Sequence, residues 1–239
     1  MKTIKLVLFS AIALLFATTS CIDDFTIRGN GIEETEGRVT SIFDEVKSEG
    51  AFDVHITNGD EYDIVITAES NILPYIETDV KGKKLRLHVR GLHNVKNRLP
   101  MQVYITTPYL EGIKQSGSGI ITTGYFESDD MDIVVSGSGT IETAVDAISV
   151  DAIVSGSGKL YISGDAVDAD YVVSGSGRID AFDLPVRDCE AKISGSGSVW
   201  TNVDRFLTAT ISGSGNVYYY GSPDVETYIS GSGNVIREN

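Results

Sequence analysis

The chain is poor in several residue types that would point to common protein classes. Its 239 residues include two cysteines, five prolines and one tryptophan, and 34 acids outnumber 19 lysines and arginines. Two cysteines cannot build a disulfide scaffold, and collagen would need frequent proline and a strict three-residue period. A net charge of −15 repels nucleic-acid phosphates, which argues against nucleic-acid binding. The apolar content of 41% nevertheless supports a folded core.

A long apolar run is also missing, and the one short run lies at the start of the chain. Lys2 and Lys5 lead into uncharged, mostly apolar residues 6–16, after which small residues lead to Cys21. This layout is typical of a secretory signal peptide covering residues 1–20, because the run is too short to span a bilayer as a helix. Cys21 resembles the lipidated cysteine of bacterial lipoproteins. Thr18 stands where leucine is usual, which leaves ordinary secretion open.

Lipidation at Cys21 would make the following residues, 21–38, a polar tether between the membrane and the fold. Asp23 and Asp24 resemble the export tag of surface lipoproteins in some Gram-negative bacteria, although a solvated tether explains them equally simply. The predicted location is therefore the outer membrane, exposed at the surface, with a periplasmic or secreted protein as the alternative. Removal of residues 1–20 leaves 17 bases against 34 acids, a net charge of −17.

Glycine is the abundant residue, and its placement predicts the architecture. Fourteen of the 25 glycines lie in seven copies of Ser-Gly-Ser-Gly, spaced 18–20 residues apart. The copies begin at Ser116, Ser136, Ser155, Ser174, Ser194, Ser212 and Ser230. Apolar and polar residues alternate before and after each copy, which is the strand period of two. A strand pattern recurring about every 19 residues predicts stacked coils with parallel sheets, so the fold class is an all-β parallel β-helix or β-solenoid.

The alternation can be continued through the motif itself. It then places both serines outside and both glycines inside, at a narrow bend where no side chain fits and the strand need not break. Two rows of hydroxyl groups along the outside of the solenoid are the expected consequence.

The residues before the repeats also alternate but lack the motif. We expect residues 39–113 to form an irregular β region packed onto a solenoid of residues 114–239, the two making one continuous unit. Residues 70–75 suggest one short helical turn, and no long amphipathic helix is predicted after the signal peptide.

These features together resemble one family. The resemblance lies in residues 50–56, residues 69–76, residues 82–85 and the Ser-Gly-Ser-Gly copies followed by aliphatic residues. The chain is similar to the head-GIN domain family, described as auto-transporter adhesins. The resemblance implies a β-helical fold on secreted or lipid-anchored bacterial proteins and an adhesin role, and it brings no catalytic motif.

Two sets of residues are candidates for ligand binding. Lys84, Arg86, His88 and Arg90 share one strand face and could hold an anionic glycan or a lipid head group. The alternative is a solvent face balanced by acidic neighbouring strands. Aromatic residues that could stack on sugar rings form the second set, with a cross-strand ladder as the alternative reading. These are Tyr161, Trp200 and Tyr218, at one outward repeat position, and Tyr220 two residues further on.

Acidic residues and possible nucleophiles are weaker candidates. Outward acids stack on successive coils and could bind Ca²⁺, but the known calcium-binding repeat is absent and solubility explains them as well. They are Asp132, Asp151, Asp170 and Glu190. Cys189, the thiol that remains after lipidation of Cys21, is expected to be a core residue. Gly-Ser-Gly segments recur in every coil, whereas an active site occurs once. We expect no enzyme, no metal and no cofactor.

The leading functional hypothesis is a cell-envelope lipoprotein, anchored in the membrane, that presents its solenoid surface to a glycan, a matrix component or an envelope protein. The alternatives are a β-helix enzyme that processes polysaccharides and a purely structural envelope spacer. Polysaccharide cleavage would need clustered carboxylates and a basic proton acceptor, and no such cluster is visible in the repeats.

Overall fold

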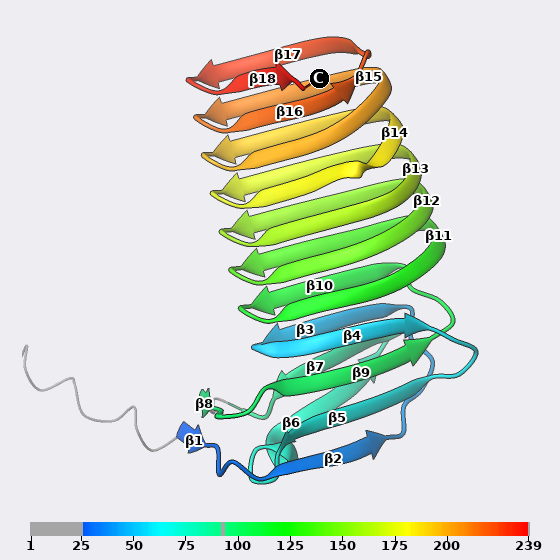
Figure 1. Cartoon of the computed structure of the whole chain (residues 1–239), viewed down its shortest axis with the longest axis vertical. Coiled ribbons are helices and arrows are strands. Elements are labelled where there is room, and N and C mark those ends of the chain that lie inside the picture. The colour runs from blue at the N-terminus through cyan, green and yellow to red at the C-terminus, as the bar shows by residue number, and fades with distance from the viewer. Residues whose placement is uncertain (1–25, 92–93, 239) are drawn as a thin grey trace, which may run out of the picture.

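The computed structural model describes residues 26–91 and 94–238, and strands make up nearly all of it (Figure 1). The helical element in this part is a 3-10 turn, η2 (Leu73–Tyr75), which confirms the predicted helical turn. No helix of the described residues is long and apolar enough to cross a membrane. The predicted signal peptide and Cys21 lie outside the described residues.

The repeats form the predicted solenoid. Five long strands each run along one face, bend, and return along the other face. They are β11 (Ile120–Gly137), β12 (Thr140–Gly156), β13 (Lys159–Gly175), β14 (Arg178–Gly195) and β15 (Ser198–Gly213). Each pairs in parallel with equivalent residues of the next coil, so that Ile121, Ile141 and Leu160 are in register. The next coil is made of β16 (Asn216–Gly221) and β17 (Asp224–Gly231), and β18 (Asn234–Arg237) begins another coil on top of β16.

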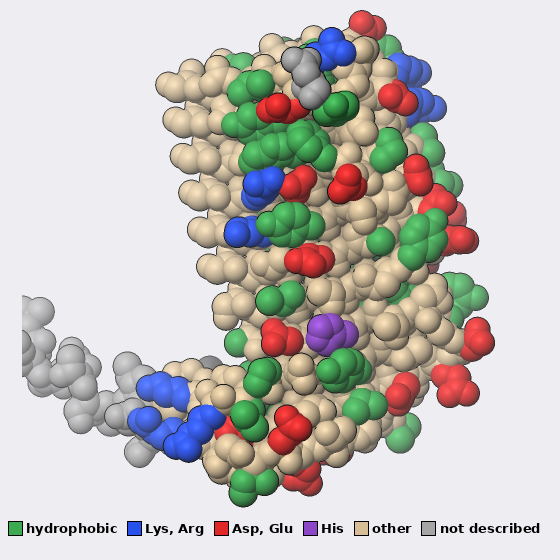
Figure 2. Space-filling view, in the orientation of Figure 1, with side chains coloured by type: hydrophobic (Ala, Val, Ile, Leu, Met, Phe, Trp, Pro, Cys, Tyr) green, Lys and Arg blue, Asp and Glu red, His purple; other side chains and the backbone are tan. Residues whose placement is uncertain are grey.

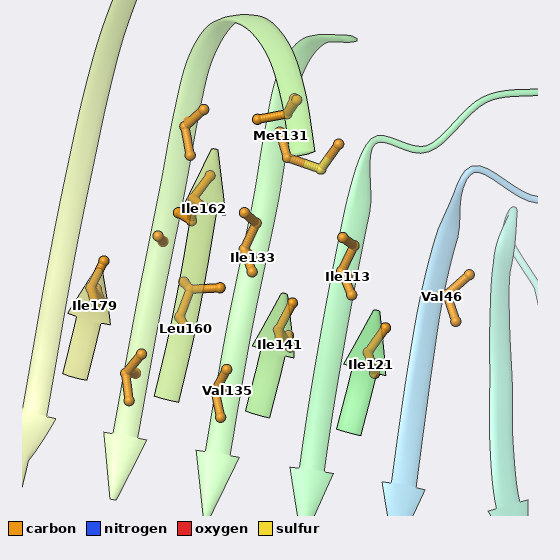
Figure 3. Close-up of a cluster of buried hydrophobic side chains, with 14 of the residues drawn as sticks. Val46, Ile113, Ile121, Met131, Ile133, Val135, Ile141, Leu160, Ile162 and Ile179 are labelled. Carbon is orange, nitrogen blue, oxygen red and sulfur yellow. The ribbon is translucent and has the colours of Figure 1, made fainter. Parts of the chain in front are cut away.

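The coils are flattened, so the solenoid consists of two facing parallel sheets. The strand segments that follow each Ser-Gly-Ser-Gly motif form the front sheet, which faces the viewer in Figure 1. The segments that precede each motif form the back sheet, which begins with β10 (Gly112–Gly117). A layer of aliphatic side chains fills the space between the sheets (Figure 3). Ile113 and Ile133 meet Ile121 and Ile141 there, all fully buried, and burial of each contributes about 1.5–3 kcal/mol.

The region before the repeats continues both sheets. The strands β3 (Glu45–Gly50) and β4 (Phe52–Asn58) form a coil that pairs in parallel with β10 and β11. The strands β7 (Lys84–Val89) and β9 (Met101–Thr107) form the next coil, below β3 and β4. The chain therefore passes from β9 across the β3–β4 coil to reach β10, and the stack does not follow chain order.

Antiparallel strands close this end of the stack. On the back sheet, β6 (Ile76–Lys81) pairs with β7, and on the front sheet β5 (Asp63–Glu69) pairs with β9. The segment expected to be a tether contains two strands in addition. They are β1 (Thr26–Arg28), which pairs with β8 (Asn94–Lys96), and β2 (Glu33–Arg38), which pairs with β5. The polar composition of residues 26–38 did not indicate these strands, because they are short, lie at edges and bury little side-chain surface.

The structure corrects the prediction for the Ser-Gly-Ser-Gly motif in one respect. The chain reverses direction between the second serine and the second glycine, so the strand ends there and the alternation of two does not pass through. The first glycine of each copy is exposed or half-buried and has a positive φ, +105° at Gly156, which favours glycine. A Cβ on Gly156 would lie 2.7 Å from the carbonyl oxygen of Gly137 in the coil below. The first glycine is thus required by the turn and by stacking, and only the second, such as Gly158, lies inside.

Candidate functional site

Outward side chains of the front sheet line up in one column across the coils. The column is held in register by parallel pairing from β9 to β18. Figure 2 shows hydrophobic and acidic side chains alternating along this face, with a histidine in its lower part. The members of this front column are Tyr104, His55, Thr122, Glu142, Tyr161, Asp180, Trp200, Tyr218 and Ile236. Neighbours in the column are separated by about 4.8 Å, the spacing of paired strands.

The upper part of the column brings together Trp200 and Tyr218. Their rings stack with centroids 4.7 Å apart and planes inclined by 14°. The guanidinium carbon of Arg178 lies 3.7 Å from the centroid of the Trp200 ring, and Asp180 holds that guanidinium by an ion pair of 2.5 Å. Trp200 is therefore covered by Arg178 and Tyr218. This arrangement favours the alternative reading of a cross-strand ladder that stabilises the sheet.

Tyr220 belongs to a different environment. It is 46% exposed and packs edge-on against Phe182, with ring centroids 6.2 Å apart. Its strand pairing places it beside Asn202, outside the front column. The four aromatic residues singled out from the sequence thus do not form one continuous platform.

Tyr161 lines a groove of about 490 Å³ on the front sheet, which we call the Tyr161 groove. Its lining is Thr122, Thr123, Glu142, Thr143, Ala144, Tyr161, Ile162, Ser163, Asp180 and Asp183. Two irregularities in strand register flank it, one after Thr122 in β11 and one between the partners of Tyr161 and Ser163 in β14. Bulges of this kind bend a strand and redirect its side chains. The groove therefore lies where the coils depart from strict repetition.

The chemistry of the groove is polar and acidic around one aromatic ring. Three carboxylates, from Glu142, Asp180 and Asp183, line it, and the lining contains no lysine or arginine. Hydroxyl groups of Thr123 and Thr143 lie 2.7 Å apart at its inner edge. A half-buried tyrosine ring beside hydroxyls and carboxylate acceptors suits a neutral, hydroxyl-rich ligand such as a sugar, and the negative charge disfavours an acidic one.

The predicted basic stripe has acidic partners along its whole length. Lys84 pairs with Glu45 at 2.7 Å, and Arg86 donates from Nε and Nη2 to one oxygen of Glu49 at 3.0 and 2.6 Å. His88 Nε2 lies 3.2 Å from Glu77, and Arg90 donates to the other oxygen of that carboxylate at 2.5 Å. Hydrogen bonds from Arg86 lower the pKa of Glu49 to about 2 against the effect of burial. These pairings favour a balanced solvent face over an anion-binding stripe.

The back sheet carries the predicted column of acids. Asp132, Asp151, Asp170 and Glu190 are in register on successive coils. Burial, and then the charges of Asp170 and Asp132, raise the pKa of Asp151. A neighbouring pocket of about 560 Å³ is lined by acids alone, namely Glu45, Glu111, Asp129, Asp130, Asp132 and Asp151. The repulsion within this column helps to keep the sheet surface soluble.

Two other groups bear on metal binding and catalysis. Among the described residues, Glu77, Asp79 and His88 could supply ligand atoms to a metal ion. Arg90 already occupies the carboxylate of Glu77, which counts against a cation there. Cys189 is buried in the core, as expected, and burial raises the pKa of its thiol to about 12, so no thiolate nucleophile forms near neutral pH.

Of the residues that line the Tyr161 groove, the sequence indicated Tyr161 as a ligand-binding candidate but not the hydroxyl and carboxylate side chains around it. Thr122, Thr143 and Ser163 look like ordinary strand residues in the repeat, because their own alternation does not show the shift in register. The available signal was Gly124, which stands in a coil one residue longer than the next.

Comparisons with known proteins agree with this architecture. The sequence profile of the family described as "Putative auto-transporter adhesin, head GIN domain" matches residues 42–223. A crystal structure of a protein named a putative adhesin from Bacteroides fragilis superposes with a TM-score of 0.82 at 23% identity, covering 89% of this chain and 100% of that chain. A protein of the same name from Parabacteroides merdae gives a TM-score of 0.75 at 25% identity, covering 90% of this chain and 99% of that one.

A third solved structure carries a different name. A protein named a putative lipid binding protein from Parabacteroides distasonis gives a TM-score of 0.72 at 22% identity, covering 90% of this chain and 100% of that one. No curated protein sequence matches the chain. The family profile covers well over half of the residues, and the chain belongs to the head-GIN domain family of adhesin-like proteins.

Proposed function

We propose that this protein is an exported, lipid-anchored adhesin-like protein that binds a neutral glycan in the Tyr161 groove. The observation that carries the proposal is the groove itself, because it combines one half-buried aromatic ring with hydroxyl and carboxylate acceptors on a rigid sheet. The family description supports an adhesin-like role and a location outside the cytoplasm. Lipidation at Cys21 rests on the sequence pattern alone.

The groove also suits a polymer that runs along the stack. Glu142, Tyr161 and Asp180 occupy successive coils of the front column, so the two carboxylates are about 10 Å apart at 4.8 Å per strand. A sugar chain along this face would meet a carboxylate acceptor, then the Tyr161 ring, then a second carboxylate acceptor.

A polysaccharide lyase is not the function that this geometry favours. Such an enzyme would need a basic proton acceptor beside the carboxylates, and the residues lining the groove include no lysine, arginine or histidine. The neighbouring cation, Arg178, is engaged by Asp180 and by the Trp200 ring. The remaining alternative is a structural spacer that binds no ligand, and a measurement of glycan binding distinguishes it from an adhesin.

The test is a glycan array and titration calorimetry with Tyr161→Ala. We expect binding of a neutral glycan by the unaltered protein and at least about a fivefold loss in the variant, because stacking on an aromatic ring contributes on the order of 1 kcal/mol or more. Tyr161→Phe should retain most of the affinity. Tyr228→Ala is the matched control, since Tyr228 is exposed on the back sheet.

Three outcomes would count against the proposal. A spacer would show no glycan binding on the array. If Trp200→Ala or Tyr218→Ala abolished binding while Tyr161→Ala did not, the upper ladder would be the site instead. Release of unsaturated sugars from a polysaccharide panel would favour the enzyme reading.

A further inference from the structure

A cluster of unpaired cations lies at the end of the fold where the N-terminal segment joins it. Arg28, at the end of β1, is in register with Lys96, at the end of β8, and Arg98 follows two residues later. All three side chains are exposed, and none forms an ion pair with another described residue. Figure 2 shows a cluster of blue side chains at the lower left corner of the fold. We call these three residues the neck cations.

Most other bases of residues 26–98 differ from the neck cations in having partners, and exposed Lys81 at the end of β6 is the exception. Lys83 pairs with Asp44, Lys84 with Glu45, and Arg86 with Glu49. Arg90 and Arg38 are likewise paired, with Glu77 and Glu36. The neck cations are therefore a concentration of positive charge without ion pairs among the described residues, although the charge of Arg98 interacts with the buried carboxylate of Glu69. The net charge of the whole chain is −15.

A buried carboxylate holds the backbone that carries the neck cations. Glu69 is fully buried, and its oxygens accept hydrogen bonds from the backbone N–H groups of Gly31 at 2.5 Å and Arg98 at 2.7 Å. The amide of Asn71 donates to the carbonyl of Arg28, and the N–H of Gly29 donates to the carbonyl of Lys96. Burial acts to raise the pKa of Glu69, but the backbone N–H groups of Arg98, Gly31 and Leu99, together with the charge of Arg98, outweigh burial and lower that pKa. Two separate segments are thus fixed side by side, with their charges pre-organised.

We propose that the neck cations dock the protein onto the anionic lipid head groups of the membrane that carries its anchor. This inference rests on the proposed lipidation of Cys21 and not on glycan binding. Arg28 is seven residues after Cys21, and seven extended residues reach at most about 25 Å. The anchor therefore keeps the neck cations close to the head groups.

The acidity of the solenoid does not cancel this attraction. The nearest member of the acidic column, Asp132 in β11, lies three strands beyond β7, about 14 Å along the back sheet. That distance exceeds the Debye length of about 10 Å at 0.1 M salt, so salt screens the acidic column from the membrane. Glu33 and Glu34 on the edge strand β2 are nearer and exposed. The face that meets the membrane is therefore the β1–β8 corner and not the β2 edge.

Docking at this corner would orient the whole molecule. An anchor alone attaches the chain to the membrane without setting the orientation of the solenoid. Three charges at one corner of the fold would hold that corner against the surface. Each lysine or arginine near an anionic surface contributes about a fivefold gain in partitioning, so three contribute on the order of 100-fold at low salt.

The experiment measures co-sedimentation of the mature chain, residues 21–239, with lipid vesicles. Cys21→Ser removes the lipid, so that acyl chains cannot dominate binding. We expect binding to vesicles of phosphatidylglycerol and phosphatidylcholine, none to phosphatidylcholine alone, and at least a tenfold loss when salt rises from about 0.05 to about 0.5 M. The triple variant Arg28→Gln, Lys96→Gln, Arg98→Gln should bind at least tenfold more weakly.

A matched control has the same change of charge on the solenoid, Lys159→Gln, Lys192→Gln, Arg237→Gln, and should bind as the unaltered chain does. Equal binding by the two triple variants would overturn the proposal, as would equal binding to neutral vesicles or no binding to anionic ones. The neck variant leaves the Tyr161 groove intact, so its glycan binding should persist. Absence of vesicle binding with glycan binding intact would therefore overturn the docking proposal alone. Absence of glycan binding with vesicle binding intact would overturn the proposed function alone.

Discussion

The coil before the repeats and the coils within them make the same tight turn with different residues. Gly50 is in register with Gly117, the first glycine of the first motif, and both have a positive φ, +137° and +118°. Ala51 and Phe52 then occupy the places that a serine and the second glycine hold in the repeats. The first glycine is therefore common to the two regions, whereas the second glycine is a property of the repeats alone.

Neighbouring coils explain why the second position differs. In the repeats each turn stacks on another tight turn, and a Cβ on Gly158 would lie 2.4 Å from Cγ1 of Val135. The coil next to Phe52 on the outer side is the β7–β9 coil, whose two strands are joined by residues 90–100 instead of a tight turn. That longer connection leaves room for a ring. The residue at the second position of the turn thus depends on whether the adjacent coil has a tight turn or a longer connection.

The largest expected effect comes from removing the ring that replaces the second glycine. Phe52→Ala should lower the free energy of unfolding by about 3–5 kcal/mol, because Phe52 is fully buried and its loss leaves a cavity. Urea denaturation followed by circular dichroism measures the change. Phe206→Ala is the matched control, since Phe206 is 46% exposed at a corner of β15 and should cost about 1 kcal/mol or less. Equal losses would mean that Phe52 does not fill the space left by the longer connection.

A smaller effect is expected at the first glycine, which the two regions share. Gly156→Val should destabilise the protein by about 2–3 kcal/mol, because the positive φ is strained for valine and the Cβ would meet the carbonyl oxygen of Gly137. Thermal melting measures the loss. Gly82→Ala measures the cost of a positive φ without a steric clash, because Gly82 has a φ of +55° and open space around it. This variant should lose about 1 kcal/mol of stability.

The serine beside that glycine provides the second control for the same measurement. Ser157 is exposed, so Ser157→Ala should change the stability by less than about 0.5 kcal/mol. If Ser157→Ala were as damaging as Gly156→Val, the assignment of serine to the outside of the turn would be wrong.

The solenoid was predictable because its signal is repeated. Seven equivalent motifs show the coil length and the inward aliphatic positions, and the structure confirms both. The conformation of the first glycine was predicted wrongly because a period of two does not reveal where the backbone reverses. The antiparallel strands β2 and β5 depend on contacts between segments far apart in the chain, which no local pattern specifies.

The candidate site was predictable only in part for a related reason. The common column of Tyr161, Trp200 and Tyr218 follows from the repeat, and strand register confirms it. Coverage of Trp200 by Arg178 depends on side-chain conformation across two strands. The acidic partner of Arg86 comes from β3, whose parallel pairing with β7 joins distant segments and could not be deduced from spacing. The partner of Arg90 comes from β6, which forms a hairpin with β7.

Acidification should change the stability of the N-terminal region and of the repeats in opposite directions. These are the smallest of the expected effects. Hydrogen bonds from Arg86 and Arg90 lower the pKa values of Glu49 and Glu77 in the N-terminal region. For Glu49 the folded value is about 2 against an ordinary 4.5, so its contribution is complete above pH 4.5 and is lost as the pH falls toward 2. In the repeats, burial and then Asp170 raise the pKa of Asp151 above its ordinary 3.8. Protonation of Asp151 therefore favours the folded state, and stability is gained as the pH falls through the raised pKa.

Hydrogen exchange at pH 7, 4 and 3 can resolve the two responses. We expect the protection of amides in β6 and β7 to fall below pH 4.5, while amides of β12 and β13 keep or gain protection between pH 7 and 4. Glu49→Gln should remove part of the first response, because a neutral side chain cannot form the ion pair with Arg86 at any pH. Asp151→Asn should remove the second response, because it takes one charge out of the column that Asp132 and Asp170 share with it. A uniform loss of protection along the whole stack would show that the coils respond to pH as one cooperative unit, and the contrast between the two regions would then be confined to their turns.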